Sequence, residues 1–175
     1  MIFNESKLRG AFEIHLEPKP DERGFFARCW CQKEFERNNI NLKLVQCSLS
    51  FNSCKGTLRG IHYQARPYAE TKLVRCTRGA IYDVIVDLRP DSPTFKDWIA
   101  VVLTAEKHNM VCVPEGCGHG FLTLEDESEV FYQMSEFYSA GSALGVRWND
   151  PAFQIDWPEK VEVISERDQS YPNFA

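Results

Sequence analysis

The chain has 175 residues, of which 43% are hydrophobic and 13% aromatic, and its formal net charge at pH 7 is -5. This length and composition predict a single domain, residues 1–175, with enough apolar side chains for a buried core. The negative charge argues against nucleic-acid binding but leaves room for a local basic pocket. The sequence has no stretch of 18 apolar residues and no signal-peptide pattern at its start, so it predicts neither a membrane span nor a secretory leader.

The seven cysteines are odd in number and form no CxxC pair. This pattern indicates neither a zinc ribbon nor a disulfide framework. Most of the cysteines have apolar neighbours, which favours buried free thiols in a reducing cytoplasm.

Strand signals dominate the chain, because runs rich in β-branched and aromatic residues alternate with short turn clusters. Strands are expected at 12–17, 25–31, 43–51, 58–64, 72–76, 80–88, 98–104, 110–113, 121–124 and 129–138. One short helix is expected at 32–39, and another in the C-terminal third. Many short strands at regular spacing predict an all-β sandwich or barrel with few helices.

Five cationic or titratable side chains fall in or beside these apolar strands: Arg23, Arg59, His62, Lys72 and His119. A single inward-facing charge is usually part of a structural ion pair, since burying an unpaired cation costs several kcal/mol. Five such groups on different strands favour a shared electropositive cavity if they converge. Its natural ligand is a phosphorylated or nucleotide-linked molecule.

The stretch LRGIHYQ places Arg59 and His62 three residues apart, so on a regular strand they would face opposite sides. Gly60 between them is a candidate bulge that would turn both inward. His119 lies in PEGCGHGF, whose glycines are expected to bend the backbone and present the imidazole at a cavity mouth.

Each of the other candidate side chains also has an ordinary structural explanation. Lys72 can reach solvent along its alkyl stem, and Tyr132 can be a buried tyrosine bonded through its hydroxyl. Asp168 can be a surface or helix-capping carboxylate.

Small β-barrels often hold a metal on an HxH…E set followed by a histidine in a PxGxxH turn. The second half is present at 114–119, but His62 is followed by Tyr63 and Gln64 rather than by another histidine. The sequence therefore predicts no metal and no other cofactor. A metal-free cavity with two histidines favours acid–base chemistry.

Several blocks, taken together, resemble the cupin-type nucleotide-sugar epimerases, the family of dTDP-4-dehydrorhamnose 3,5-epimerase. The blocks are DERGFF (21–26), QCSLS (46–50), GTLRGIHYQ (56–64), KLVRCTRGAIYDVIVDLRPDSPTF (72–95), VPEGCGHGF (113–121), RWNDPAFQIDWP (147–158) and SERD (165–168). The resemblance implies a cupin jelly roll without metal. It also implies a cytoplasmic homodimer whose N-terminal segment adds to the partner's sheet, with a C-terminal tail packed on the barrel.

The resemblance further implies epimerisation at C3, C5 or both of a nucleotide-linked 4-keto-6-deoxy sugar through an enolate. His62 would be the base, since the pKa of a free imidazole is about 6.5 and suits proton abstraction at neutral pH. Asp168 would orient His62, Lys72 would stabilise the enolate, and Tyr132 would return the proton from the opposite face.

Binding of the substrate would fall to a second set of residues by the same resemblance. Arg23 and Arg59 would hold the diphosphate, His119 would line the sugar pocket, and Tyr138 would stack on the base near Gln46. Phe26, Arg28 and Ser48 also fall at ligand-side positions of the family pattern.

The sequence departs from that pattern at three ligand-side positions, Arg28, Ser48 and Ala143, where the family usually has Glu, Asn and Glu. Thymidine is the expected base, with GDP- or CDP-linked 4-keto sugars as alternatives. Other possibilities are a nucleotide-sugar 3,4-ketoisomerase, a sugar-binding cupin without activity and, more remotely, a metalloenzyme. No nucleic acid or membrane partner is expected.

Overall fold

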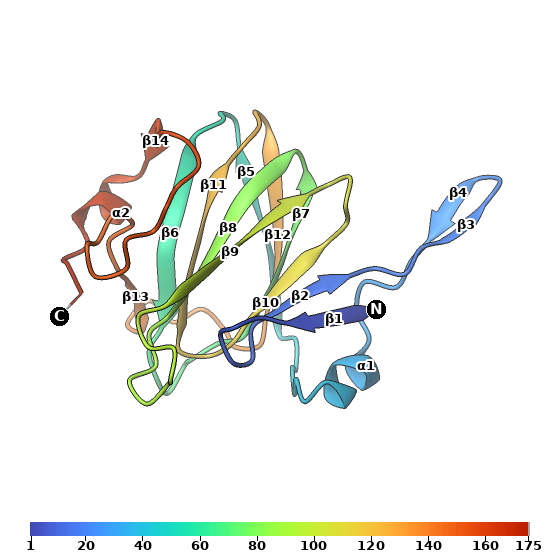
Figure 1. Ribbon diagram of the computed structural model, residues 1–175, viewed down its shortest axis with the longest axis horizontal. Helices are drawn as coiled ribbons and strands as arrows, with labels where there is room; N and C mark the ends of the chain where they lie inside the picture. The colour runs from blue at the N-terminus through green and yellow to red at the C-terminus, as the bar shows by residue number, and fades with distance from the viewer. Residues whose placement is uncertain (175) are drawn as a thin grey trace.

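The computed structural model describes residues 1–174, and its strands form two antiparallel sheets that face each other (Figure 1). Sheet I has the order β1 (Ile2–Glu5), β2 (Phe12–His15), β10 (Met110–Val113), β7 (Lys72–Arg78), β12 (Ser128–Met134) and β5 (Gln46–Asn52). Sheet II has the order β13 (Ala143–Gly145), β6 (Thr57–Gln64), β11 (Cys117–Thr123), β8 (Ala80–Asp87) and β9 (Trp98–Thr104), and β14 (Val163–Ile164) runs parallel to β6. The all-β prediction is confirmed.

The main hydrophobic core fills the space between the sheets. Sheet I contributes Val74 and Val111, and sheet II contributes Ile81, Ile85 and Phe121, all at most 1% exposed. The alternation of inward and outward side chains along each strand explains this set. In β8 the outward residues are apolar as well, which is why AIYDVIVD reads as an almost continuous apolar run.

Two further clusters cover parts of the outer faces of the sheets. The short helix α1 (Gln32–Arg37) buries Phe35 against the outer face of sheet I. The segment that follows β13 packs Val146 and Phe153 against the outer face of sheet II. Beyond that segment, helix α2 (Glu166–Ser170) lies beside β6 (Figure 1).

A separate hairpin of β3 (Lys19–Asp21) and β4 (Gly24–Phe26) extends away from the two sheets (Figure 1). All six of its strand residues are exposed, including Phe25 and Phe26. The predicted strand at 25–31 was therefore too long: of the apolar residues of FFARCWC, Phe25 and Phe26 lie on the hairpin, whereas Trp30 lies beyond it and packs against Phe35.

Strand β6 is irregular at Gly60, as the sequence predicted. His62 pairs with His119 of β11, whereas Arg59 pairs with Phe121, so the register shifts between the two pairs. Gly60 has φ +130°, and a Cβ there would lie 2.5 Å from the Cα of Gly120. Both the backbone conformation and the close strand contact therefore require glycine.

Two expectations about the polar and thiol residues were wrong. Cys117 to Gly120 lie inside β11 and are buried, so His119 is not at a turn. Gly118 serves close packing there, since a Cβ would come within 2.5 Å of Ile61. Of the seven free cysteines, Cys76, Cys112 and Cys117 are buried, while Cys29, Cys47 and Cys54 are exposed.

Among residues 1–174, no helix has the length and apolarity to cross a membrane.

Candidate active site

A cavity of about 440 Å³ is lined by side chains from both sheets and from the loops at one end of them. Its lining consists of Gln46, Ser48, Leu49, Ser50, Arg59, His62, Glu70, Lys72, His119, Tyr132, Met134 and Tyr138. Four of the five cationic or titratable groups picked out from the strand pattern therefore converge here, and Arg23 does not.

His62 projects from β6 and is paired with a carboxylate from α2. Its Nε2 lies 2.6 Å from Asp168 Oδ1, and the backbone N–H of Gly60 donates to Asp168 Oδ2 at 3.2 Å. Ser165 caps the helix by accepting a hydrogen bond from the Asp168 N–H at 3.1 Å. The irregularity of strand β6 at Gly60 thus helps to hold the Asp168 carboxylate, which in turn orients the His62 imidazole.

The environment of Asp168 keeps it ionised. Burial by itself disfavours the charged form, but hydrogen bonds from His62 and Gly60, together with the positive charge of a protonated His62, outweigh burial. The pKa of Asp168 is therefore lower than its ordinary value. The carboxylate can support a positive charge that develops on His62.

A second His–Asp pair lies directly across from the first. His119 pairs with His62 between β11 and β6, and its Nε2 lies 2.8 Å from Asp83 Oδ2 on β8. Asp83 is 1% exposed, and its Oδ1 has no hydrogen-bond partner among residues 1–174. Burial raises the pKa of Asp83, although the nearby His119 and Lys72 act in the opposite direction. Sequence reasoning did not pick out Asp83. The feature that could have indicated it is a carboxylate in the middle of an otherwise apolar strand.

Tyr132 faces the cavity from β12, in the sheet opposite His62. It lies across from Ser48 of β5 and from Val74 of β7 in the strand register. Its ring contacts that of His119 edge to face at 6.0 Å. Burial and the nearby Asp83 carboxylate raise the pKa of Tyr132, so its hydroxyl stays protonated.

Lys72 begins β7 at the end of the cavity near His62. Its Nζ lies 3.2 Å from Glu70 Oε1 and donates to the backbone carbonyl of His62 at 3.3 Å. Its side chain is 12% exposed, so this cation is held within the cavity wall. Sequence reasoning did not pick out Glu70, which comes two residues before Lys72 in an unremarkable polar loop.

The remaining cavity residues line a more open side. Arg59 donates from Nε to Asn52 Oδ1 at 2.7 Å and is otherwise exposed. The N–H of Tyr138 donates to Gln46 Oε1 at 3.2 Å, and the Tyr138 residue is 60% exposed. Ser48 lies on β5, next to a buried hydroxyl of Ser50 that has no hydrogen-bond partner within residues 1–174.

Three residues expected to bind ligand lie outside this cavity in the single chain. Arg23 and Phe26 are on the projecting hairpin, where Arg23 Nη2 donates to Asp21 Oδ2 at 2.5 Å and Phe26 is 71% exposed. Arg28 follows the hairpin and donates to Glu34 Oε1 at 3.1 Å.

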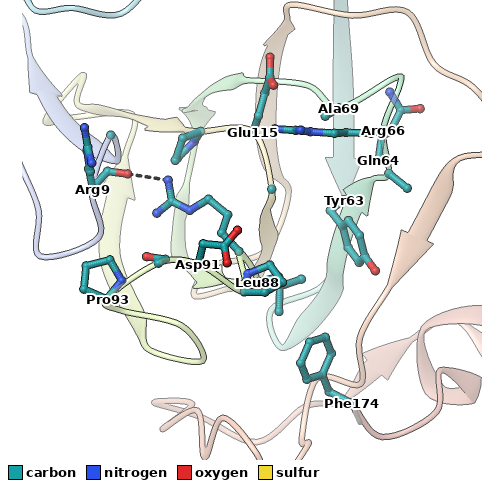
Figure 2. A pocket seen from close by; sticks show the side chains of 17 residues that line it. Arg9, Tyr63, Gln64, Arg66, Ala69, Leu88, Asp91, Pro93, Glu115 and Phe174 are labelled. Atoms are coloured by element: carbon teal, nitrogen blue, oxygen red, sulfur yellow. Dashed lines mark hydrogen bonds between the residues drawn. The ribbon is translucent and has the colours of Figure 1, made fainter.

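A larger cavity, about 740 Å³, is lined mainly by the loops that follow β6, β8 and β10 (Figure 2). Its three arginines, Arg9, Arg66 and Arg89, are accompanied by the acidic Asp91 and Glu115, and Arg89 is bound to Asp87. Neither histidine nor any other predicted site residue lines it. The smaller cavity therefore holds the groups that can transfer protons.

Among residues 1–174, no group of three or more His, Cys, Asp or Glu side chains is arranged to hold a metal ion. The cavity instead combines an imidazole from one sheet with a phenol from the other, and places Lys72 and His119 beside them. Such an arrangement can remove a proton from an activated carbon on one side and return a proton from the other.

Comparison with known proteins shows the family to which the chain is related. A family model described as dTDP-4-dehydrorhamnose 3,5-epimerase matches residues 5–175. The enzyme of that name from Shigella flexneri is 45% identical over 163 residues, which cover 91% of this chain and 90% of the relative.

Two solved structures extend the similarity to the whole fold. The Bacillus anthracis enzyme of the same name, solved with TDP and PPi bound, is 40% identical, covers 99% of both chains and has a TM-score of 0.95. A Legionella pneumophila 3,5-epimerase in complex with dTDP-4-keto-L-rhamnose is 33% identical, covers 97% of this chain and 90% of its own, and has a TM-score of 0.90. The chain belongs to the dTDP-4-dehydrorhamnose 3,5-epimerase family.

Proposed function

We propose that the chain epimerises C3 and C5 of a dTDP-linked 4-keto-6-deoxy sugar by removing and returning protons through an enolate. One observation carries the proposal: His62, paired with Asp168 at 2.6 Å, and Tyr132 line the same cavity from opposite sheets. Inversion at carbon requires a base on one face and an acid on the other, and this placement supplies both.

His62 is the base in this proposal. The C4 ketone acidifies the hydrogens on C3 and C5, and the free nitrogen lone pair of the neutral imidazole takes one of them. The C–H electrons form the C=C bond of an enolate, and the negative charge moves to the C4 oxygen. The ionised Asp168 stabilises the imidazolium that results.

Lys72 and His119 are placed to stabilise the enolate oxygen. Lys72 carries a fixed positive charge in the cavity wall, and His119 is backed by the Asp83 carboxyl group at 2.8 Å. Donors fixed in advance and shielded from water stabilise developing charge strongly, because they need no reorganisation during the reaction.

Tyr132 is the acid. Its raised pKa keeps the phenol protonated until the enolate carbon takes the proton from the face opposite His62. The C4 carbonyl re-forms with the configuration inverted, and exchange with solvent restores the protonation states of His62 and Tyr132.

The open side of the cavity suits the nucleotide. Arg59 can bind the diphosphate with its exposed guanidinium, and the exposed ring of Tyr138 can stack on the base. The TDP bound in the Bacillus anthracis relative and the dTDP-4-keto-L-rhamnose bound in the Legionella pneumophila relative support a dTDP-linked substrate.

We also propose a homodimer in which the β3–β4 hairpin of each chain reaches the cavity of its partner. The Phe25 ring packs against that of His108 at 5.0 Å, yet Phe25 and Phe26 are still 49% and 71% exposed on the projecting hairpin. This is an unfavourable arrangement for a lone chain. A partner's cavity would cover the two phenylalanines and would bring Arg23 and Arg28 to the ligand, as the family resemblance implies.

The proposal is tested by incubating the protein in heavy water with dTDP-, GDP- and CDP-linked 4-keto-6-deoxy sugars and counting the deuterons gained by mass spectrometry. Two deuterons in the dTDP-linked sugar, with both centres inverted by NMR, are expected. Binding of dTDP without deuterium gain in any sugar would overturn the proposal, and so would a shift of the ketone from C4 to C3.

A further inference from the structure

Gln64 ends strand β6 two residues after His62, and its side chain is buried although it carries a polar amide. It is 4% exposed. Because residues i and i+2 of a strand share a face, Gln64 extends the line of β6 from the proposed base toward the loops at the cavity mouth. Figure 2 shows Gln64 on the wall of the larger cavity, near Arg66 and Ala69.

The Gln64 amide connects two loops through three hydrogen bonds. Its Nε2 donates to the carbonyl of Tyr68 at 3.0 Å and to the carbonyl of Phe137 at 3.2 Å. Its Oε1 accepts from the N–H of Ser139 at 2.7 Å. Both donors of the amide are therefore used, and only an amide can make this set of bonds.

The bonds to Phe137 and Ser139 flank Tyr138 on both sides. The N–H of Tyr138 donates to Gln46 Oε1, and a hydrogen bond between the Tyr138 hydroxyl and Arg167 raises the pKa of that arginine. The Tyr138 residue is nevertheless 60% exposed. Gln64 therefore holds the backbone on both sides of Tyr138, from which its ring projects. The third bond, to Tyr68, ties the loop that leads to Glu70 and Lys72 to the same strand.

We propose that Gln64 is a positioning residue that fixes Tyr138 for stacking on the nucleotide base, and so sets the affinity for the nucleotide without moving a proton. This inference rests on the proposed function only in taking Tyr138 as the base-stacking residue. It assigns a separate task to the last residue of LRGIHYQ, beside the tasks proposed for Arg59 and His62.

Gln64→Glu is the sharpest variant, because it keeps the shape of the side chain and removes both donors. A carboxylate would face the Tyr68 and Phe137 carbonyls and repel them. The dissociation constant for dTDP, measured by calorimetry, is expected to rise roughly tenfold. The KM for the dTDP-linked sugar should rise with it, while kcat stays within about threefold of the wild type, as for loss of uniform binding.

Asn109 offers a matched control. It is 1% exposed, its Nδ2 donates to Glu13 Oε1 and to the Val102 carbonyl, each at 3.0 Å, and its Oδ1 accepts from the Thr104 N–H at 3.3 Å. It lines neither cavity. Asn109→Asp makes the same chemical change away from the cavity, and its dTDP affinity should stay within about twofold of the wild type.

A double-mutant cycle with Tyr138→Ala tests whether Gln64 acts through Tyr138. In the Tyr138→Ala background, Gln64→Glu should weaken dTDP binding by less than about twofold, because the ring it positions is gone. If Gln64→Glu loses its cooperative melting transition, Gln64→Met replaces it with the same expected weakening. Unchanged dTDP affinity in the folded variant, full additivity with Tyr138→Ala, or a fall in kcat at unchanged KM would each overturn the inference.

The calorimetric experiment measures binding of dTDP and does not depend on turnover. Wild-type protein that binds dTDP but exchanges no deuterium would refute the proposed reaction and leave the role of Gln64 open to confirmation. Conversely, normal exchange together with unaltered dTDP affinity in Gln64→Glu would refute only the role of Gln64.

Discussion

His62 and His119 lie directly opposite each other on β6 and β11, and each ring is bonded through Nε2 to a different buried aspartate. Burial opposes ionisation of both aspartates, but their pKa values shift in opposite directions. The hydrogen bonds around Asp168 lower its pKa, whereas the pKa of Asp83, which has one oxygen without a partner among residues 1–174, is raised by burial. The two pairs can therefore serve different purposes at neighbouring positions.

Asp168→Asn should lower the rate of deuterium exchange into the sugar by about 10²-fold or more at pH 7. The amide keeps the shape of the side chain but cannot stabilise an imidazolium on His62. Glu166→Gln is the control, because Glu166 lies on the same helix and is exposed. An Asp168→Asn variant that exchanges as fast as Glu166→Gln would contradict the role given to the carboxylate.

Asp83→Asn should slow turnover by about tenfold or more while leaving the protein at least as stable at pH 7. The folded pKa of Asp83 is above its unfolded value, so this carboxyl group costs stability that grows as the pH rises from the unfolded pKa to the folded pKa and persists above it. An amide removes that cost and still bonds to His119. Urea unfolding and deuterium exchange measure the two effects, and a clear loss of stability at unchanged turnover would contradict the prediction.

Gly60→Ala should lower the free energy of unfolding by about 2–4 kcal/mol, because alanine disfavours φ +130° and its Cβ would meet the Gly120 backbone at 2.5 Å. Gly141→Ala is the matched control, since a Cβ at Gly141 has no neighbour within 4 Å. Thermal or urea unfolding of both variants makes the comparison. Equal stabilities would show that β6 can relax at Gly60.

Asp87→Asn should lower stability by about 3 kcal/mol at pH 7. Burial opposes ionisation of Asp87, but hydrogen bonds from Arg89, Ser92 and Thr94 outweigh it and hold its pKa well below the ordinary 3.8. The stabilisation is present above the unfolded pKa and is lost as the pH falls through the folded one.

The stability gap between the wild type and Asp87→Asn should therefore narrow as the pH falls below about 4. Urea unfolding at several pH values measures it. Asp91→Asn, an exposed position in the same loop, should show no such gap. A gap that widens toward low pH would show that the ionised form of Asp87 is not the stabilising one.

Mixing two defective chains tests the proposed dimer. One chain carries Arg23→Ala and Phe26→Ala on the hairpin, and the other carries His62→Ala. Each alone should exchange little deuterium. When the two chains are refolded together, mixed dimers should recover part of the activity. In a mixed dimer, the cavity of the hairpin variant keeps its own His62 and receives the intact hairpin of the His62→Ala chain.

A mixture of His62→Ala with Lys72→Ala chains should recover nothing if both residues act within one cavity, and it serves as the control. Failure of the hairpin mixture to recover activity would contradict the proposed exchange of hairpins, as would a monomeric mass by light scattering.

The strands with the strongest apolar patterns were predictable to within a residue. The structure places β9 at Trp98–Thr104 and β10 at Met110–Val113, the ranges that the sequence predicted. All four residues of β10 are buried, whereas β9 contributes the buried Leu103 and the partly buried Ile99 and Val101 to the core. The strand expected at 129–138 ends at Met134, because the chain there leaves sheet I for the loop that carries Tyr138.

The sequence predicts a shared cavity if five cationic or titratable groups converge. Arg59, His62, Lys72 and His119 line the smaller cavity, whereas Arg23 lies on the projecting hairpin. The carboxylates behind these groups were harder to find. Asp83 meets His119 only when β8 packs beside β11. Glu70 meets Lys72 only when the chain enters β7. No local pattern in a single sequence encodes those contacts.

Asp168 follows every strand of both sheets in chain order, yet it supports an imidazole on β6 that was made about a hundred residues earlier. Apart from the two-residue β14, both sheets are complete in chain order by Gly145. The carboxylate that pairs with His62 is therefore the last part of this cluster along the chain. A chain cut just before α2 would keep every strand of both sheets and lose Asp168.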